Sequence, residues 1–291
     1  MKTIKLFGLL AVALTLTLTS CKKDEPTVIE YTGIYFMDAD NEDIETLPIA
    51  GGTPTVLIEG VWGAGIAYDK THEKIFYSTY TDEDNNITGK IWVADVDGKN
   101  AKAIVTDIVD PYQVALDVKN GKVYWGDDSG NISRCNLDGT GKQNIVTIDG
   151  GGIRAVAIDE TNKKLYFYDA KNQNMYKADL DGKNKSVIIS GKWGYCIAVD
   201  EKNSKIYFDV LTDDDSFNGL YMANLDGSNI TAIAENTDNF RIYGIAIDNY
   251  KNKIYWSERN GSIFQANLNG TGKVKLNSAE LGSPRGIFLK Y

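Results

Sequence analysis

Short apolar runs alternate with polar turns along most of the chain, and one five-residue phrase recurs among them. The phrase holds small and branched apolar residues and closes on an Asp, as in Ala155-Val156-Ala157-Ile158-Asp159. A fixed period of this length indicates repeated structural units. The five full copies and a degraded sixth are spaced by 48, 42, 41, 48 and 42 residues and end at Asp69, Asp117, Asp159, Asp200, Asp248 and Lys290.

Each full copy is followed by a Lys-bearing turn, a second apolar run, a third run that meets a tight turn, and a fourth run. The tight turns are Asp-Gly or Asn-Gly pairs, which supply the positive φ that short hairpins need. Four short strands in a period of about 40–45 residues are typical of one β-propeller blade. The pattern therefore predicts an all-β protein.

The two ends of the chain complete a sixth repeat. Residues 286–291 match only its first strand, while residues 34–36, 44–49 and 55–58 match its second, third and fourth strands, with a turn at Gly51-Gly52. We therefore predict a six-bladed β-propeller of four-stranded antiparallel blades over residues 33–291. Pairing the terminal strands in one blade would close the ring and remove exposed sheet edges.

Two second runs carry a Tyr-Trp pair, Val123-Tyr124-Trp125-Gly126-Asp127 and Ile254-Tyr255-Trp256-Ser257-Glu258, each with a Leu-Asp-Gly or Leu-Asn-Gly downstream. Over residues 31–291 the chain resembles the low-density lipoprotein receptor class B family, the YWTD repeat. The resemblance implies a six-bladed ring and a binding role, without a particular partner. No repeat spells the motif in full, and only two carry its Trp.

The first residues have the pattern of an export signal. Lys2 and Lys5 precede a short apolar stretch over residues 6–18, too short to indicate a membrane span. Leu18-Thr19-Ser20-Cys21 resembles the lipobox of bacterial lipoproteins. That resemblance implies a signal peptide over residues 1–20, a lipid anchor on Cys21, a charged tether over residues 21–32 and an outer-membrane location. Periplasmic and surface-exposed orientations stay open, as does an ordinary secretory peptide with a stray Cys.

Charge and cysteine content narrow the function classes. The chain has 40 acidic and 31 basic residues, a net charge of −9, which argues against a nucleic-acid binder. Cys135 and Cys196 fall in different repeats, and we expect both to be buried free thiols. We expect the propeller to be a monomeric domain.

Candidate binding residues gather where the first strand of each repeat begins. Strand direction alternates, so these positions share one face, called here the top, with the turns after each second strand. Three of the five Arg fall there, among Tyr and Trp, which fits a sugar, an anionic small molecule or an acidic peptide. The predicted ligand-binding residues are Trp62, Tyr112, Arg154, Trp193, Tyr195, Arg241, Tyr243 and Arg285. In the alternative interpretation the aromatic residues pack between blades and the Arg pair with Asp127, Asp169 and Glu258.

Two repeats have longer top-face segments, residues 80–88 and 211–218, predicted as loops. Both are acidic, with Asp82-Glu83-Asp84 and Asp213-Asp214-Asp215. Calcium binds several oxygen ligands in one loop, so these are candidate calcium sites, and solvated loops are the alternative.

Other signals predict structure rather than chemistry. Asp95–Asn100 and Asp179–Asn184 resemble calcium-loop fragments but lack the distal Glu, and we expect hairpin turns. The recurring Asp should cap its turn. His72, the single His, lacks partners for a triad or a metal cluster, and we expect an exposed bystander.

The leading hypothesis is therefore a lipid-anchored binding or scaffold protein of the cell envelope that presents its top face to an extracellular or periplasmic protein, peptide or glycan. We expect no catalytic residue and no cofactor. The alternative is a metal-dependent hydrolase or lactonase of the six-bladed type, which holds a metal in the channel with Glu, Asn and Asp. A purely structural subunit is the third candidate.

Overall fold

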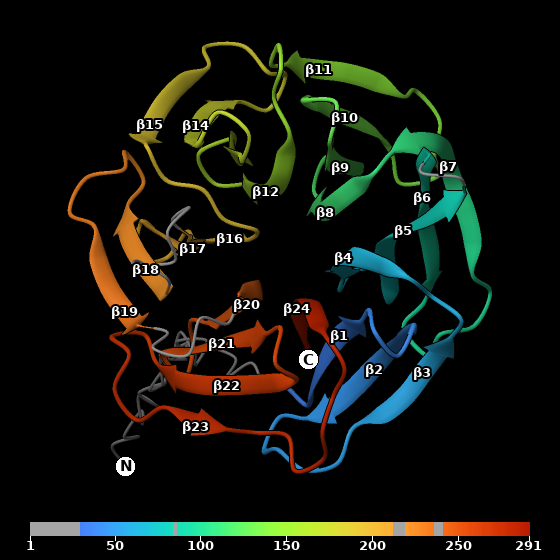
Figure 1. Ribbon diagram of the computed structural model, residues 1–291, viewed down its shortest axis with the longest axis vertical. Coiled ribbons are helices and arrows are strands. Elements are labelled where there is room, and N and C mark those ends of the chain that lie inside the picture. Colours follow the sequence, from blue (N-terminus) through green and yellow to red (C-terminus); the bar gives the residue numbers. More distant parts are fainter. Residues whose placement is uncertain (1–29, 84–85, 212–218, 236–240) are drawn as a thin grey trace, which may run out of the picture.

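The computed structural model describes residues 30–83, 86–211, 219–235 and 241–291, and these residues form a ring of six four-stranded antiparallel sheets (Figure 1). The first two sheets, from the channel outward, are β24 (Pro284–Lys290), β1 (Gly33–Asp38), β2 (Asp43–Pro48) and β3 (Thr55–Glu59), then β4 (Gly63–Asp69), β5 (Lys74–Glu83), β6 (Asn86–Asp95) and β7 (Lys102–Val109). The third and fourth are β8 (Pro111–Asp117), β9 (Lys122–Asp127), β10 (Asn131–Asn136) and β11 (Gln143–Thr147), then β12 (Ile153–Asp159), β13 (Lys164–Asp169), β14 (Asn174–Asp179) and β15 (Ser186–Ser190). The last two are β16 (Ile197–Asp200), β17 (Lys205–Val210), β18 (Gly219–Asn224) and β19 (Thr231–Glu235), then β20 (Ile242–Asp248), β21 (Lys253–Glu258), β22 (Ser262–Asn267) and β23 (Val274–Lys275).

The recurring phrase forms the innermost strand of each blade, and the predicted six-bladed fold is confirmed. The apolar core lies between neighbouring blades. One such cluster joins Phe76 and Ile91 of the second blade to Val114 and Trp125 of the third. Trp125 and Trp256, which carry the family resemblance, are fully buried. Each strand therefore serves two interfaces, which explains the dense apolar runs.

The predicted seam is also confirmed. β24 pairs antiparallel with β1, with Ile34 opposite Leu289 and Phe36 opposite Ile287. The buried Asp38 carboxylate accepts hydrogen bonds from the backbone N–H groups of Gly282 (2.8 Å) and Ser283 (2.7 Å), 244 and 245 residues away along the chain. The two ends of the chain thus hold one blade together.

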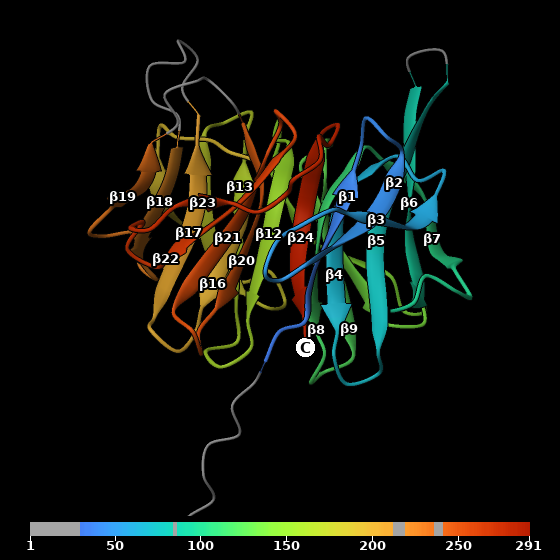
Figure 2. The same cartoon turned by 90° about the horizontal axis from the view of Figure 1, so that it is seen from below.

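On the lower face in Figure 2, where the inner strands end, the recurring Asp caps its turn as predicted. Asp69 accepts from the backbone N–H of Thr71 at 2.9 Å and of His72 at 3.1 Å. The His72 ring also lies 2.7 Å from the Asp69 carboxylate, and its side chain is 57% exposed. Asp95–Asn100 and Asp179–Asn184 are hairpin turns, as expected, in which Asp97 and Asp181 accept from the backbone N–H groups of Lys99 and Lys183.

The prediction of a loop over residues 80–88 is wrong. β5 and β6 are ten residues each and continue as a paired hairpin through Thr81 opposite Thr88. The hydrogen-bonded pairing of β5 with β6 continues through this segment, with side chains on alternate faces, so the two strands are longer and no loop opens there. The hairpin projects beyond the other strands on the upper face (Figure 2).

Several sequence predictions fall outside the described residues. They are the signal peptide, the Cys21 anchor, most of the tether, Asp84, and the acidic run at Asp213–Asp215. Cys135 and Cys196 are described, and both are buried free thiols as predicted. Within the described part of the chain, no helix has the length and apolarity to cross a membrane.

Candidate functional site at the upper mouth of the channel

A cavity of about 270 Å³ opens at the upper mouth of the channel. Six of its lining residues occupy equivalent positions in the six blades. Each lies in the inner strand or just before it, five positions before the recurring Asp or its equivalent. Trp62 and Asp110, which precede two of them by two positions, also line it. The full lining is Trp62, Ala64, Tyr80, Ile87, Asp110, Tyr112, Gln113, Arg154, Tyr195, Tyr243 and Arg285. The structure therefore brings six of the eight predicted residues into one cavity.

Local irregularities in the inner strands aim these side chains at the channel. The register of β8 shifts between Pro111 and Val114, around Tyr112, and that of β12 shifts between Ile153 and Ala155, around Arg154. Similar shifts surround Ala64, Tyr243 and Arg285. A β-bulge re-aims a side chain in this way.

The fifth blade reaches the same result differently. β16 begins only at Ile197, because the buried Asp209 carboxylate takes the backbone N–H groups of Tyr195 (2.8 Å) and Cys196 (2.9 Å). Those two N–H groups therefore have a side-chain acceptor instead of a strand partner. Tyr195 then meets Tyr243 edge-on, with ring centroids 4.7 Å apart.

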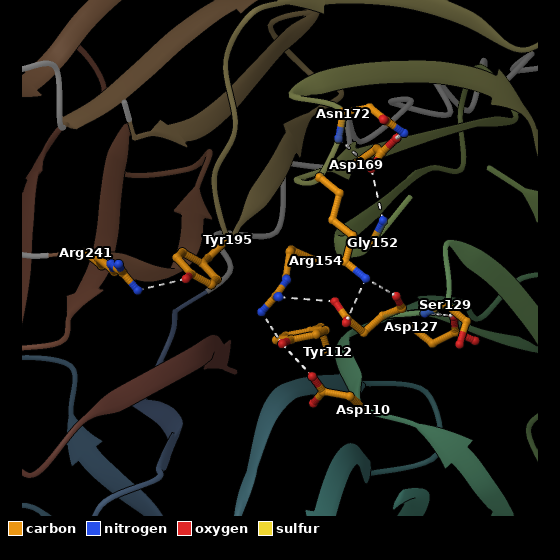
Figure 3. A network of polar contacts seen from close by, with 12 residues as sticks. Asp110, Tyr112, Asp127, Ser129, Gly152, Arg154, Asp169, Asn172, Tyr195 and Arg241 are labelled. Atoms are coloured by element: carbon orange, nitrogen blue, oxygen red, sulfur yellow. Dashed lines mark hydrogen bonds and ion pairs between the residues drawn. The ribbon is translucent and has the colours of Figure 1, made fainter. Parts of the chain in front are cut away.

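Arg154 lies at the centre of the polar network in the cavity (Figure 3). Its guanidinium carbon is 4.0 Å from the centroid of the Tyr112 ring, and its Nη1 donates a hydrogen bond to the Tyr112 hydroxyl. Nη2 pairs with Asp128 at 3.2 Å, and Lys171 shares that carboxylate at 2.9 Å. Two cations therefore share one carboxylate on this side of the cavity.

Arg285 lies against the aromatic wall on the opposite side. It donates to the Tyr80 hydroxyl and lies 5.4 Å from the centroid of Tyr243. Among the described residues, no carboxylate lies within 4.0 Å of it, and its Nε is buried without an acceptor. Arg154 Nε is buried without an acceptor as well. Both Nε atoms are therefore enclosed by the folded chain, while the side chains of Arg154 and Arg285 line the cavity.

Two predicted residues stand behind the cavity wall. Trp193 packs edge-on against Tyr195 at 5.6 Å, and Arg241 donates to the Tyr195 hydroxyl at 3.0 Å (Figure 3). Neither lines the cavity. Their place is to support Tyr195.

The alternative pairing of the Arg with Asp127, Asp169 and Glu258 is wrong. Asp127 accepts from the backbone N–H groups of Ser129 and Asn131, and Asp169 from that of Gly152 (Figure 3). Glu258 accepts from the Trp256 indole at 2.9 Å. These buried carboxylates end their strands beside unpaired N–H groups, which they satisfy first.

One carboxylate does line the cavity. Asp110 accepts from the Tyr112 hydroxyl at 2.7 Å, and burial raises the pKa of Asp110 above its usual range despite that hydrogen bond. Burial also raises the pKa of Tyr80, Tyr112 and Tyr195, so their hydroxyls are neutral donors at neutral pH. A cavity in which planar Arg cations lie among aromatic rings suits a ligand that carries carboxylate or hydroxyl groups.

The described residues hold no group of three or more His, Cys, Asp or Glu placed to bind a metal ion. Asp82 is exposed on the projecting hairpin, and the remaining candidate calcium ligands named above are not described or have undescribed side chains. The calcium hypothesis therefore stays a prediction from sequence.

A larger cavity of about 740 Å³ opens at the lower mouth. Much of its wall is aliphatic, from residues such as Leu116, Val199 and Ile247, and the stacked Tyr31 and Tyr291 rings lie at its edge. Its acid Glu160 already accepts from the backbone N–H of Val118 at 3.0 Å. We place the candidate site at the upper mouth because six of the eight predicted binding residues, two Arg among them, line the cavity there.

Tyr80 is the main lining residue that sequence reasoning missed. It is 7% exposed, meets Trp62 edge-on at 4.2 Å and holds Arg285. It lies in the segment that the sequence predicted as a loop. Alternation of Tyr77, Thr79 and Thr81 along that segment was the signal for a longer strand.

No protein-family model matches the chain. The vitellogenin receptor of Solenopsis invicta is 32% identical over 111 residues, which is 38% of this chain and 6% of the receptor. The chain thus corresponds to a small part of that relative. Among solved structures, the nidogen/laminin complex aligns with a TM-score of 0.76 and 15% identity over 89% of this chain and 98% of that one. TolB from Acinetobacter baumannii aligns with a TM-score of 0.68 and 11% identity over 88% and 65%.

These similarities define the class of protein. The chain is a six-bladed β-propeller, and its resemblance to the YWTD repeat of the low-density lipoprotein receptor class B family is confirmed. At these sequence identities, similarity to the solved structures establishes the fold alone.

Proposed function

We propose that this protein is a binding module of the cell envelope, and that its ligand enters the cavity at the upper mouth of the channel. The ligand is a glycan, a peptide or a small molecule that carries a carboxylate or another anionic group. We also propose that the protein is not an enzyme and that a lipid on Cys21 anchors it to the outer membrane.

The surroundings of Arg285 are the observation on which this proposal rests. Its side chain lines the cavity beside Tyr80 and Tyr243, and it has no carboxylate partner among the described residues. Burying a cation part-way is costly unless a partner satisfies it. An anionic ligand would supply that partner, and Arg binds carboxylates through two parallel hydrogen bonds.

The cavity lining supports binding rather than metal-assisted hydrolysis. Among the described residues that line the cavity, Asp110 is the single carboxylate. A catalytic metal in a channel needs several converging oxygen ligands, and the lining offers few. The similar fold in the nidogen/laminin complex belongs to a complex of two proteins, which agrees with a binding role.

Array screening tests the proposal. The mature chain is applied to glycan and peptide arrays together with Arg285→Ala and Arg154→Ala. We expect both variants to lose roughly tenfold or more in affinity for the best probes, since each removes a charged contact. Arg259→Ala is the matched control, because Arg259 is exposed on a turn of the same face and does not line the cavity.

Thermal unfolding of each variant checks that the ring is intact. Arg285→Gln serves as a second variant that keeps hydrogen-bond donors but loses the charge. Undiminished binding by folded Arg285→Ala and Arg154→Ala proteins would overturn the proposed site.

A further inference from the structure

A second hollow lies on the far side of two residues that line the upper cavity. Trp62 and Tyr80 line both, and the hollow continues between the chain after β3 and the β5–β6 hairpin. Its volume is about 360 Å³. We call it the side groove. Each hollow is near the lower end of the range of about 300–1,000 Å³ typical of small-ligand sites. The two hollows share Trp62 and Tyr80 as lining residues.

One face of the β5–β6 hairpin forms the floor of the side groove. Tyr77, Thr79 and Thr81 alternate along β5, and Thr88, Lys90 and Trp92 alternate along β6. The strand register places them in three opposing pairs. Because successive side chains of a strand point to opposite faces, these six share one face.

The chemistry of this floor suits a sugar ring. Trp92 is part-exposed, lies parallel to Tyr77 with centroids 6.2 Å apart, and donates through Nε1 to Thr79 Oγ1 at 2.9 Å. These contacts fix the orientation of the indole. A fixed flat aromatic face packs against the C–H face of a pyranose, and Thr81 and Thr88 supply hydroxyl groups for its polar edge.

The charged side chains of the two hollows are not all paired with one another. Lys90 is exposed, lies 5.8 Å from the Trp92 centroid, and has no carboxylate within ion-pair distance among the described residues. Glu59 is the single acid among the described residues that line the groove. Together with Arg285, Lys90 leaves an unpaired cation in each hollow, on a protein whose net charge is −9.

An extended peptide fits this floor less well. Near Trp92 the floor offers no free strand edge, because β5 pairs with β4 and β6 up to Thr79 and β6 pairs with β7 from Thr88 onward. Beyond Thr79, the inner edge of β5 has no strand partner among the described residues. Peptides that bind sheets in extended form use a free edge, which the floor near Trp92 lacks.

We propose that the upper cavity and the side groove together bind a linear oligosaccharide that carries uronic acid units. One carboxylate pairs with Arg285, the chain passes over Trp62 and Tyr80, and a further ring stacks on Trp92 beside Lys90. The proposal rests on the proposed function and specifies its ligand.

Calorimetric titration with galacturonic acid and its dimer, tetramer and hexamer tests the proposal. We expect affinity to rise with length up to the tetramer or hexamer. Trp92→Ala should weaken hexamer binding roughly tenfold and leave the monomer unchanged, and Trp92→Phe should retain most of the affinity. Arg285→Ala should weaken binding at every length. Tyr250→Ala removes an aromatic ring that is 48% exposed outside both hollows and is the matched control.

The outcomes separate the two proposals. Length-independent binding that responds to Arg285→Ala but not to Trp92→Ala would overturn the side groove and leave the upper cavity standing. Binding of neutral maltohexaose as tight as that of the uronate hexamer would overturn the acidic class. Failure of every galacturonate together with binding of a poly-glutamate peptide that depends on Arg285 would overturn the oligosaccharide while supporting the proposed function.

Discussion

A single buried carboxylate, that of Asp209, fixes part of the backbone on the upper face. Asp209 is 1% exposed and accepts from the N–H groups of Tyr195 and Cys196. In other blades Ser78 and Ser257 occupy the matching strand position, where the Ser78 hydroxyl accepts from the Gly65 N–H at 2.9 Å. Asp209 is the charged version of this contact, and it holds the backbone that carries Tyr195.

Stability should therefore depend on pH through Asp209. Burial raises its pKa to about 7 from 3.8 in the unfolded chain, so the folded protein binds the extra proton between those values and loses stability as pH rises. Between pH 5 and 8 this group should cost about 3 kcal/mol. Asp209→Asn keeps a carbonyl acceptor without a charge. Denaturant unfolding at both pH values should show a smaller loss for this variant, and equal losses would contradict the assignment.

At the scale of elements, the Asp-Gly turns, each between the third and fourth strands of a blade, pack against the outer strand of the preceding blade. Gly182 has a φ of 82°, and a Cβ on it would lie 1.9 Å from the carbonyl oxygen of Ile145 on the outer strand of the preceding blade. Gly98, Gly139, Gly227 and Gly270 approach the preceding blade in the same way. The sequence predicts the positive φ of these turns, and only the folded ring shows that they also need space.

Gly182→Ala should separate these two effects. A positive φ alone costs an L-residue about 1–2 kcal/mol, and displacing the neighbouring strand adds to that. Gly150→Ala is the matched control, because Gly150 has a φ of 67° and nothing within 4 Å of the added methyl group. We expect Gly182→Ala to destabilise the fold by at least about 1 kcal/mol more than Gly150→Ala. Equal unfolding midpoints would argue against tight packing between blades.

Much of the site was predictable because the repeat fixes the position of each strand entry. Alignment of the repeats on the recurring Asp is enough to place Tyr112, Arg154 and Arg285 at one mouth of the channel. The partners were not predictable in the same way. Arg154 pairs with Asp128 rather than Asp127, since a bulge or a turn shifts side-chain direction by one residue. The position of Tyr80 depended on how far β5 and β6 remain paired, and the alternation along β5 was the one local signal for that length.

At the scale of the whole molecule, closure of the ring depends on seven residues at one end of the chain. β24 supplies the inner strand of its blade, and Ile287, Phe288 and Leu289 are all below 9% exposed. Those side chains pack into two different inter-blade clusters, with Ile287 and Leu289 in one and Phe288 in the other. Removing the strand therefore opens two interfaces at once and exposes an edge of β1.

Deletion of residues 286–291 should consequently destabilise the entire propeller rather than one blade. Burial of three large apolar side chains alone contributes roughly 5 kcal/mol or more, comparable with the whole stability of many domains. Deletion of Tyr291 alone is the control, because it removes the ring stacked on Tyr31 at 4.6 Å and leaves β24 intact. Calorimetry should show one cooperative transition in the control and a strongly lowered or absent one in the longer deletion. An unchanged transition after the longer deletion would mean that the ring is stable without its seam.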